Sequence, residues 1–340
     1  MKYFSFNVSL FLILNTVVSM LLISPHVNAG DGAHHDKRSF TLAGPGAVVS
    51  YPLMVMAQKK MLSQQHIALE FVQWKNPQQL RAMVLGGQVD FTAMPSNLAA
   101  TFYNRGHKLS LVNISIWDIM SIVSQQGERL ADLHALIGQE IAVPFKNDMP
   151  SIVFKELLNA NLANKASQVK IRNSHNLADT AQLLLASKVK HALLIEPLSS
   201  VVLYQANKNI TQKQGVSLVT SFNISQLWQR SFPNSPKLPQ AGLVANIPVN
   251  QDRNVVKSVN QAYKAASTWC QENIAECVKI VRVYLPKMPR EALMSAIEKT
   301  AITTVDAKLA KSDLESFYRL LAKSDAKRIG NKLPAEGFYF

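Results

Sequence analysis

The sequence predicts an α/β protein of two similar lobes, each a mostly parallel sheet flanked by helices, followed by a helical C-terminal region. Three observations lead to this fold class. Short apolar runs alternate with longer helical patterns from Ser39 to Ile195, as in parallel α/β sheets. The pattern of the first half returns in weaker form in the second half. Beyond residue 250, apolar residues recur mainly at helical spacing.

The first 29 residues have the features of a secretory signal peptide. Lys2 gives a positive start, Leu10 to Ile23 is apolar apart from three polar residues, and Val27-Asn28-Ala29 resembles a cleavage site. The alternative is a membrane anchor, which needs about 20 unbroken apolar residues. We therefore expect cleavage, a polar leader over residues 30–37, and a soluble protein exported to the periplasm. Gly30 rather than a cysteine follows the expected cut, which argues against a lipid anchor.

Strands and helices alternate through the first lobe. Gly44-Pro45-Gly46 is a tight loop, and Ser50, Asn76 and Ser96 stand where helix N-caps are expected. The expected strands are 39–43, 67–74 and 89–93, and the expected helices are 50–62, 76–84 and 97–103. A long apolar segment, 109–123, has the character of a strand that crosses to the second lobe.

The same order of elements returns in the second lobe. The expected strands are 140–143, 169–171 and 191–195, and the expected helices are 151–160 and 179–186. Leu80 to Asn97 and Ala181 to Ser200 also share a helix, a small-residue break, a strand and a proline-containing loop. This weak internal repeat favours two related lobes. We place the crossings near Val112–Val123 and Gln240–Pro248, so that lobe 1 is 38–118 with 243–340, and lobe 2 is 119–242.

The C-terminal third contains a helix with Val255, Val259 and Tyr263 on one face. Cys270 and Cys277 lie near its end. In an exported chain such a close pair suggests a disulfide. Seven residues of one straight helix span about 10.5 Å, too far for a bridge, so Gln271-Glu272-Asn273 must supply a turn.

The chain carries a formal net charge of +14, which suits an anionic partner. The lysines and arginines are scattered and form no recognised nucleic-acid motif. We interpret the charge mainly as a solvated surface and expect no nucleic-acid partner. No Ser-His-Asp, metal-ligand or phosphate-loop pattern stands out, so we expect no catalytic residue, no cofactor and no metal.

Several segments resemble the periplasmic solute-binding proteins of ABC transporters, of the nitrate/sulfonate/taurine and thiamine-precursor type. "GPGAVVSYPLMVMAQKKML" is similar to the opening strand, loop and helix of that family, and "LRAMVLGGQVDFTAMPSN" to its second signature. "LADLHALIGQEIAVP" resembles its entry to the second lobe. "LLLASKVKHALLIEPLSS" and "WCQENIAECVKIV" resemble later segments. The likeness covers nearly all of residues 38–300.

The resemblance implies the type II periplasmic binding protein fold and the substrate-binding role of an ABC importer. Such a protein captures a small organic ligand in a cleft between its lobes, closes about a hinge, and delivers the ligand to an inner-membrane permease. It acts as a monomer and is not an enzyme. A ligand sensor that docks on a membrane signalling protein is the alternative, and an enzyme on the same fold is less favoured because of the signal peptide.

The expected cleft lies beyond the carboxyl ends of the strands of both lobes. The candidate ligand-binding residues of the first lobe and the hinge are Gly46, Ser50, Tyr51, Trp74, Lys75, Asn76, Met94, Ser96, Asn97 and Trp117. Those of the second lobe are Phe145, Lys146, Asn147, Asp148 and Glu196. For the three cap residues the simpler interpretation is helix capping, and for the tryptophans it is core packing.

Two ligand classes remain open from these residues. Lys75, Lys146 and the helix N-termini favour a small anion such as a sulfonate, because helix N-termini carry positive dipole ends. Trp74, Trp117, Phe145 and Met94 favour a flat heterocycle such as a thiamine precursor.

Overall fold

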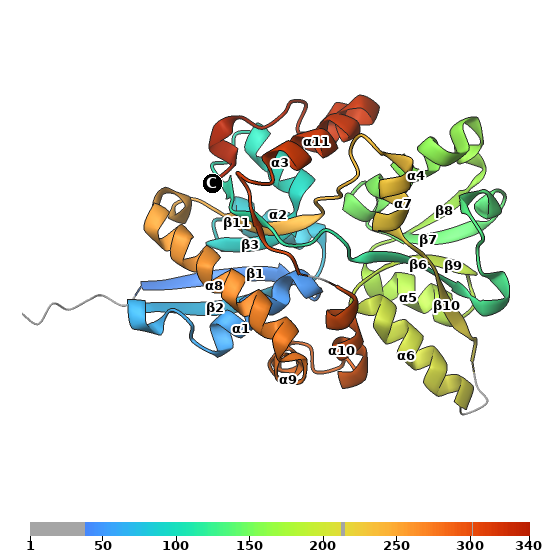
Figure 1. The fold of residues 1–340 in the computed structure, drawn as a ribbon, viewed down its shortest axis with the longest axis horizontal. Coiled ribbons are helices and arrows are strands. Elements are labelled where there is room, and N and C mark those ends of the chain that lie inside the picture. The colour runs from blue at the N-terminus through green and yellow to red at the C-terminus, as the bar shows by residue number, and fades with distance from the viewer. Residues whose placement is uncertain (1–37, 212–214, 301) are drawn as a thin grey trace, which may run out of the picture. The chain divides into compact units, whose positions relative to one another are not determined.

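The computed structural model describes residues 38–211, 215–300 and 302–340 of the chain (Figure 1). The expected signal peptide and polar leader, residues 1–37, lie outside the described residues. Within the described ranges, no helix is both long and apolar enough to cross a membrane.

The first of two five-stranded sheets has the order β2-β1-β3-β11-β4. β1, β2 and β3 are parallel, and β11 runs antiparallel to both of its neighbours, β3 and β4. The register aligns Pro45 with Trp74 and Pro95 with Ala241. Pro45, Trp74 and Pro95 end their strands at this edge of the sheet, and Ala241 begins β11 there. The strands are β1 (Arg38–Pro45), β2 (Ile67–Trp74), β3 (Phe91–Pro95), β4 (Ser110–Leu111) and β11 (Ala241–Ala245).

The second sheet repeats this plan with the order β10-β6-β9-β7-β8. β7, β8 and β9 are parallel, and β6 runs antiparallel to both β9 and β10. The two related lobes and the mostly parallel sheets that the sequence predicted are therefore confirmed. The strands are β6 (Met120–Gln125), β7 (Glu140–Pro144), β8 (Lys170–Ser174), β9 (His191–Ile195) and β10 (Leu218–Asn223).

The chain passes twice between the sheets. It leaves the first sheet after the short strand β5 (Asn113–Ile114) and enters the second at β6, through residues 115–119. It returns through residues 232–240, between α7 (Ile224–Ser231) and β11. The return lies earlier than the expected 240–248, because Ala241–Ala245 already forms a buried strand of the first sheet.

Helices cover both faces of the first sheet because its side chains alternate between them. Leu42 and Phe91 pack in a cluster with α1, α8 and α9. Ala43 and Met94 pack in a second cluster with α2, α3 and α11. The helices are α1 (Tyr51–Gln58), α2 (Pro77–Leu85), α3 (Ser96–Asn104), α8 (Arg253–Glu272), α9 (Ile274–Tyr284) and α11 (Lys311–Asp325).

The second sheet is covered in the same way. Ile141 and Leu193 share a cluster with α4 and α7, and Ala142 and Leu194 share another with α5 and α6. The helices are α4 (Met149–Leu162), α5 (Leu177–Leu185) and α6 (Leu198–Thr211). Helix α10 (Arg290–Lys299) contacts α6, and the Lys299 ammonium donates a hydrogen bond to Ser200 Oγ at 3.3 Å. The C-terminal region thus touches both lobes, and its short strand β12 (Val305–Asp306) pairs with β5.

A disulfide joins Cys270 and Cys277, with an S–S distance of 2.07 Å. Asn273 separates α8 from α9 and brings the two Cα atoms within 5.0 Å of each other. Both cysteines are fully buried in the cluster of the first lobe. The expected disulfide, and the turn it required, are confirmed.

Candidate functional site

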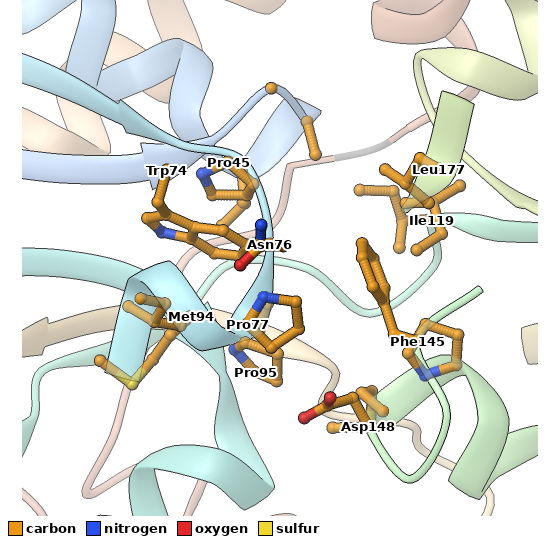
Figure 2. A pocket seen from close by; sticks show the side chains of 18 of the residues that line it. Pro45, Trp74, Asn76, Pro77, Met94, Pro95, Ile119, Phe145, Asp148 and Leu177 are labelled. Carbon is orange, nitrogen blue, oxygen red and sulfur yellow. The ribbon is translucent and has the colours of Figure 1, made fainter. Parts of the chain in front are cut away.

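A cavity of about 530 Å³ lies at the carboxyl ends of the parallel strands of both sheets. Pro45, Trp74 and Pro95 end β1, β2 and β3 on one side, and Phe145 and Ile195 stand at the ends of β7 and β9 on the other. Figure 2 shows Trp74, Pro45 and Asn76 facing Phe145, Ile119 and Leu177 across the pocket. Ligands of open α/β sheets bind at this edge, so we take this cavity as the candidate binding site.

The turn between β2 and α2 forms much of the first-lobe wall. The Trp74 indole is almost buried and donates a hydrogen bond to the Ala93 carbonyl at 3.3 Å, which fixes its ring against β3. Asn76 is the N-cap of α2, and its side-chain oxygen accepts from the Gln79 backbone N–H at 2.8 Å. The Gln73 amide lies so close to Gly46 that a Cβ there would be 2.7 Å from Gln73 Nε2.

The turn between β8 and α5 forms the corresponding wall of the second lobe. Asn176 is the N-cap of α5, and its side-chain oxygen accepts from the Asp179 backbone N–H at 2.8 Å. Leu177 and Ala178 follow it and line the pocket. Asn176 therefore occupies the place in its lobe that Asn76 occupies in the first.

Asp148 brings a carboxylate to the pocket and pairs with Arg81 of α2 at 2.6 Å. It is the N-cap of α4 but caps no backbone N–H with its side chain, because the carboxylate turns to the guanidinium of the other lobe. Burial raises the pKa of the Asp148 carboxyl above its ordinary value, and the opposing effect of Arg81 is smaller. This ion pair is a direct link between the two lobes.

Seven of the sequence-predicted site residues line the cavity. They are Gly46, Trp74, Lys75, Asn76, Met94, Phe145 and Asp148. The structure brings them together from both lobes, as the cleft hypothesis requires. The other eight lie outside the lining, namely Ser50, Tyr51, Ser96, Asn97, Trp117, Lys146, Asn147 and Glu196.

Ser50 and Tyr51 are buried behind the pocket wall. Ser50 is the N-cap of α1 but makes no side-chain cap, and its hydroxyl has no partner among the described residues. The Tyr51 hydroxyl is likewise buried without a partner among the residues described. Burial raises the pKa of Tyr51 well above its ordinary value, and the negative charge of Glu196 raises it further.

Ser96, Asn97 and Trp117 hold parts of the fold together. The expected N-cap role of Ser96 is wrong: Pro95 is the N-cap of α3, and Ser96 Oγ donates instead to the Pro239 carbonyl. Asn97 Nδ2 donates to the Arg328 carbonyl at 3.2 Å. The Trp117 indole N–H donates to the Thr303 carbonyl at 2.9 Å.

Lys146 and Asn147 point away from the lining because the loop before α4 turns sharply. Phe145 and Asn147 both have positive φ, 57° and 65°, so successive side chains leave in different directions and only Phe145 and Asp148 reach the pocket. Glu196 is buried and accepts hydrogen bonds from the backbone N–H and hydroxyl of Ser200, at 3.2 and 3.1 Å. It lines a separate cavity of about 230 Å³.

Sequence reasoning missed several lining residues. Asn176 and Leu177 could have been found by extending the internal repeat one turn further, since Asn76 had already been selected. Arg81, which lies outside the lining but reaches Asp148 from α2, carried no local signal. Most of the remaining missed positions are apolar and come from distant segments, among them Ile116, Ile119, Met120, Leu198 and Met288. Gln73 and Gln240 are the polar ones.

No group of three or more His, Cys, Asp and Glu residues that could hold a metal occurs in the described part of the chain. The lining itself contains only one carboxylate side chain, that of Asp148. The arrangement is therefore suited to holding an organic molecule by its shape and its apolar surface.

No protein family model matches the chain, and no curated protein is similar to it in sequence. Solved structures are similar. An ABC transporter protein from Parabacteroides distasonis superposes with a TM-score of 0.72 at 18% identity, over 90% of this chain and 99% of that one.

Two further structures are of known ligand type. The alkanesulfonate-binding protein SsuA from Xanthomonas axonopodis pv. citri, bound to MOPS, gives a TM-score of 0.64 at 16% identity, over 88% of this chain and 97% of that one. The periplasmic nitrate-binding protein NrtA from Synechocystis PCC 6803 gives 0.65 at 14% identity, over 88% and 86%. At these identities the likeness establishes the fold, which is the type II periplasmic binding protein fold that the sequence resemblance implied.

Proposed function

We propose that the protein is the periplasmic substrate-binding component of an ABC importer. It captures a small organic ligand between its lobes and delivers it to a permease in the inner membrane. The observation that carries the proposal is the cavity at the carboxyl ends of both sheets, lined from both lobes, on a fold shared with ABC transporter binding proteins. The function is binding and not catalysis.

The mechanism that we propose is closure about the two crossing segments. A ligand that contacts Trp74 and Phe145 together is bound best when the lobes approach each other, so binding favours the closed arrangement. The Arg81–Asp148 ion pair spans the same gap and favours the same arrangement. The lobe division that we propose is the expected one with its second boundary moved to residues 240–241, because β11 begins at Ala241.

The ligand that we propose is organic. The ammonium of Lys75 and the helix N-termini around the pocket favour an electron-rich or anionic group on it, and Trp74 and Phe145 favour a flat or apolar part.

Native mass spectrometry of the protein isolated from the periplasm tests this function. We expect one small organic molecule bound to each chain. The control is Ala178→Trp, which fills the pocket from an exposed position at the start of α5 and should abolish the adduct. A native protein without an adduct, or an adduct that survives in the variant, would contradict the proposal.

A further inference from the structure

The walls of the candidate pocket are mainly apolar. Trp74, Leu80 and Met94 contribute from the first lobe, and Phe145, Leu177 and Leu198 from the second. Removing apolar surface from water is favourable in proportion to its area. A ligand gains most in this pocket by bringing a matching apolar surface of its own.

Most polar groups of the lining are already engaged within the protein. Both ends of the Asn176 amide are bonded, to the Asp179 N–H and carboxylate. Gln240 Nε2 donates to the Trp117 carbonyl and to Ser225 Oγ, at 3.1 and 3.2 Å. The Asp148 carboxylate pairs with Arg81.

The hydrogen-bond donors of side chains that remain available lie together at the end of β2 and the start of α2. Among the residues that the structure describes, the Lys75 ammonium, the Gln73 side chain and Asn76 Nδ2 have no hydrogen-bond partner. All three residues line the pocket. Lys75 and Asn76 offer N–H donors there, as does the amide nitrogen of Gln73. This cluster, Gln73-Lys75-Asn76, can therefore hold one acceptor group.

The available polar groups of the lining disfavour small, strongly hydrated anions as ligands. The one lysine in the lining, Lys75, is exposed, and the neighbouring Arg81 is occupied by Asp148. An anion without an apolar part would lose hydration against the apolar walls and find no buried positive charge in return.

Resting on the proposed function of this pocket, we infer that its ligand is an apolar organic molecule with a single hydrogen-bond-accepting end. The apolar body lies between Trp74 and the second-lobe wall at Phe145 and Leu177, and the accepting end lies at Gln73-Lys75-Asn76. The shared chemistry is that of a carboxylate or a neutral carbonyl on an apolar framework. The same chemistry excludes nitrate and taurine as ligands of this pocket.

Calorimetric titration with four probes tests the inference: 2-naphthoate, 2-naphthamide, taurine and nitrate. We expect at least one naphthalene probe to bind with a Kd ten-fold or more below those of taurine and nitrate. The ratio of the Kd values of 2-naphthoate and 2-naphthamide shows whether a charged or a neutral accepting end binds better. Taurine or nitrate binding as tightly as the tighter naphthalene probe would overturn the inference, and so would binding of none of the four. An adduct in native mass spectrometry would then still support the proposed binding function.

Matched variants locate the binding. Leu177→Asn places a polar group of similar size in the lining, at the first residue of α5, and should raise the Kd of the tighter naphthalene probe at least five-fold. Leu85→Asn at the end of α2, where the side chain is 56% exposed and outside the lining, should leave it unchanged. Equal Kd values for Leu177→Asn and the unmodified protein, with matching circular dichroism spectra, would overturn the assignment.

A lysine pair tests the accepting end. Lys75→Gln should raise the Kd of 2-naphthoate more than that of 2-naphthamide, because only the former carries a full charge. Lys146→Gln, outside the lining, should change neither. An effect of Lys146→Gln larger than that of Lys75→Gln would overturn the placement of this end.

Discussion

The Arg81–Asp148 ion pair should strengthen ligand binding by holding the lobes together. Its N–O distance is 2.6 Å, and the two side chains are 36% and 13% exposed. Exposed pairs contribute about 0.2–1 kcal/mol, whereas breaking a buried pair costs about 3–5 kcal/mol. The exposed fractions of the two side chains place this pair between the two classes. We therefore expect the pair to contribute about 1.5 kcal/mol to the stability of the closed arrangement.

This energy enters the binding equilibrium because the pair joins α2 of one lobe to the start of α4 of the other. Its contribution is present in the closed arrangement and absent when the lobes are apart. A difference of about 1.4 kcal/mol is ten-fold in a dissociation constant. Arg81→Gln should therefore raise the Kd of the bound molecule, or of 2-naphthoate, about ten-fold in calorimetric titration.

A double-mutant cycle separates the pair from direct ligand contacts, since Asp148 also lines the pocket. Arg81→Gln and Asp148→Asn, measured singly and together, should show a coupling of about 1.5 kcal/mol. Glu276→Gln is the matched control, because its pair with Lys279 has the same 2.6 Å distance but lies within α9. Additive effects in the cycle, or an unchanged Kd in Arg81→Gln, would refute the reasoning.

Three further predictions concern stability. Burial raises the pKa of Asp148 above its ordinary 3.8, so this carboxyl makes the fold most stable below pH 3.8 and lowers its stability as pH rises to the folded-state pKa. Urea unfolding at stepped pH should show this fall and its loss in Asp148→Asn, and parallel profiles would contradict it. Gly242→Ala should cost about 3 kcal/mol or more, since its Cβ would lie 1.8 Å from the Asn113 carbonyl oxygen; a loss under about 1 kcal/mol in urea unfolding would argue otherwise. Reducing the Cys270–Cys277 bridge should lower the free energy of unfolding by about 2.5 kcal/mol, from the closure of a short loop, and two free thiols in the denatured, unreduced protein would disprove the bridge.

Much of the fold could be predicted because its signals are local. Alternating apolar runs located the parallel strands β1, β2, β3, β7, β8 and β9, and the spacing of Cys270 and Cys277 required the turn found at Asn273. The weak repeat between the halves indicated two lobes of one plan, which the matching strand orders confirm. The return crossing was placed too late because an apolar run was taken for a connection when it forms β11.

The site could be predicted only in part because side-chain direction depends on the tertiary path. Four consecutive residues from Phe145 to Asp148 were equally good candidates in sequence, and two positive-φ positions decide which of them reach the pocket. Ser96 resembled a helix cap, but Pro239 of the return crossing offers its hydroxyl a carbonyl acceptor. Arg81 was missed because its partner is 67 residues away in the sequence.

A crystal structure of the protein with its co-purified molecule tests the central claim most directly. We predict one ligand between Trp74 and Phe145, in contact with both lobes, its apolar part against Leu177 and its accepting end at Lys75. A ligand bound to a single lobe, or outside this cavity, would contradict the account.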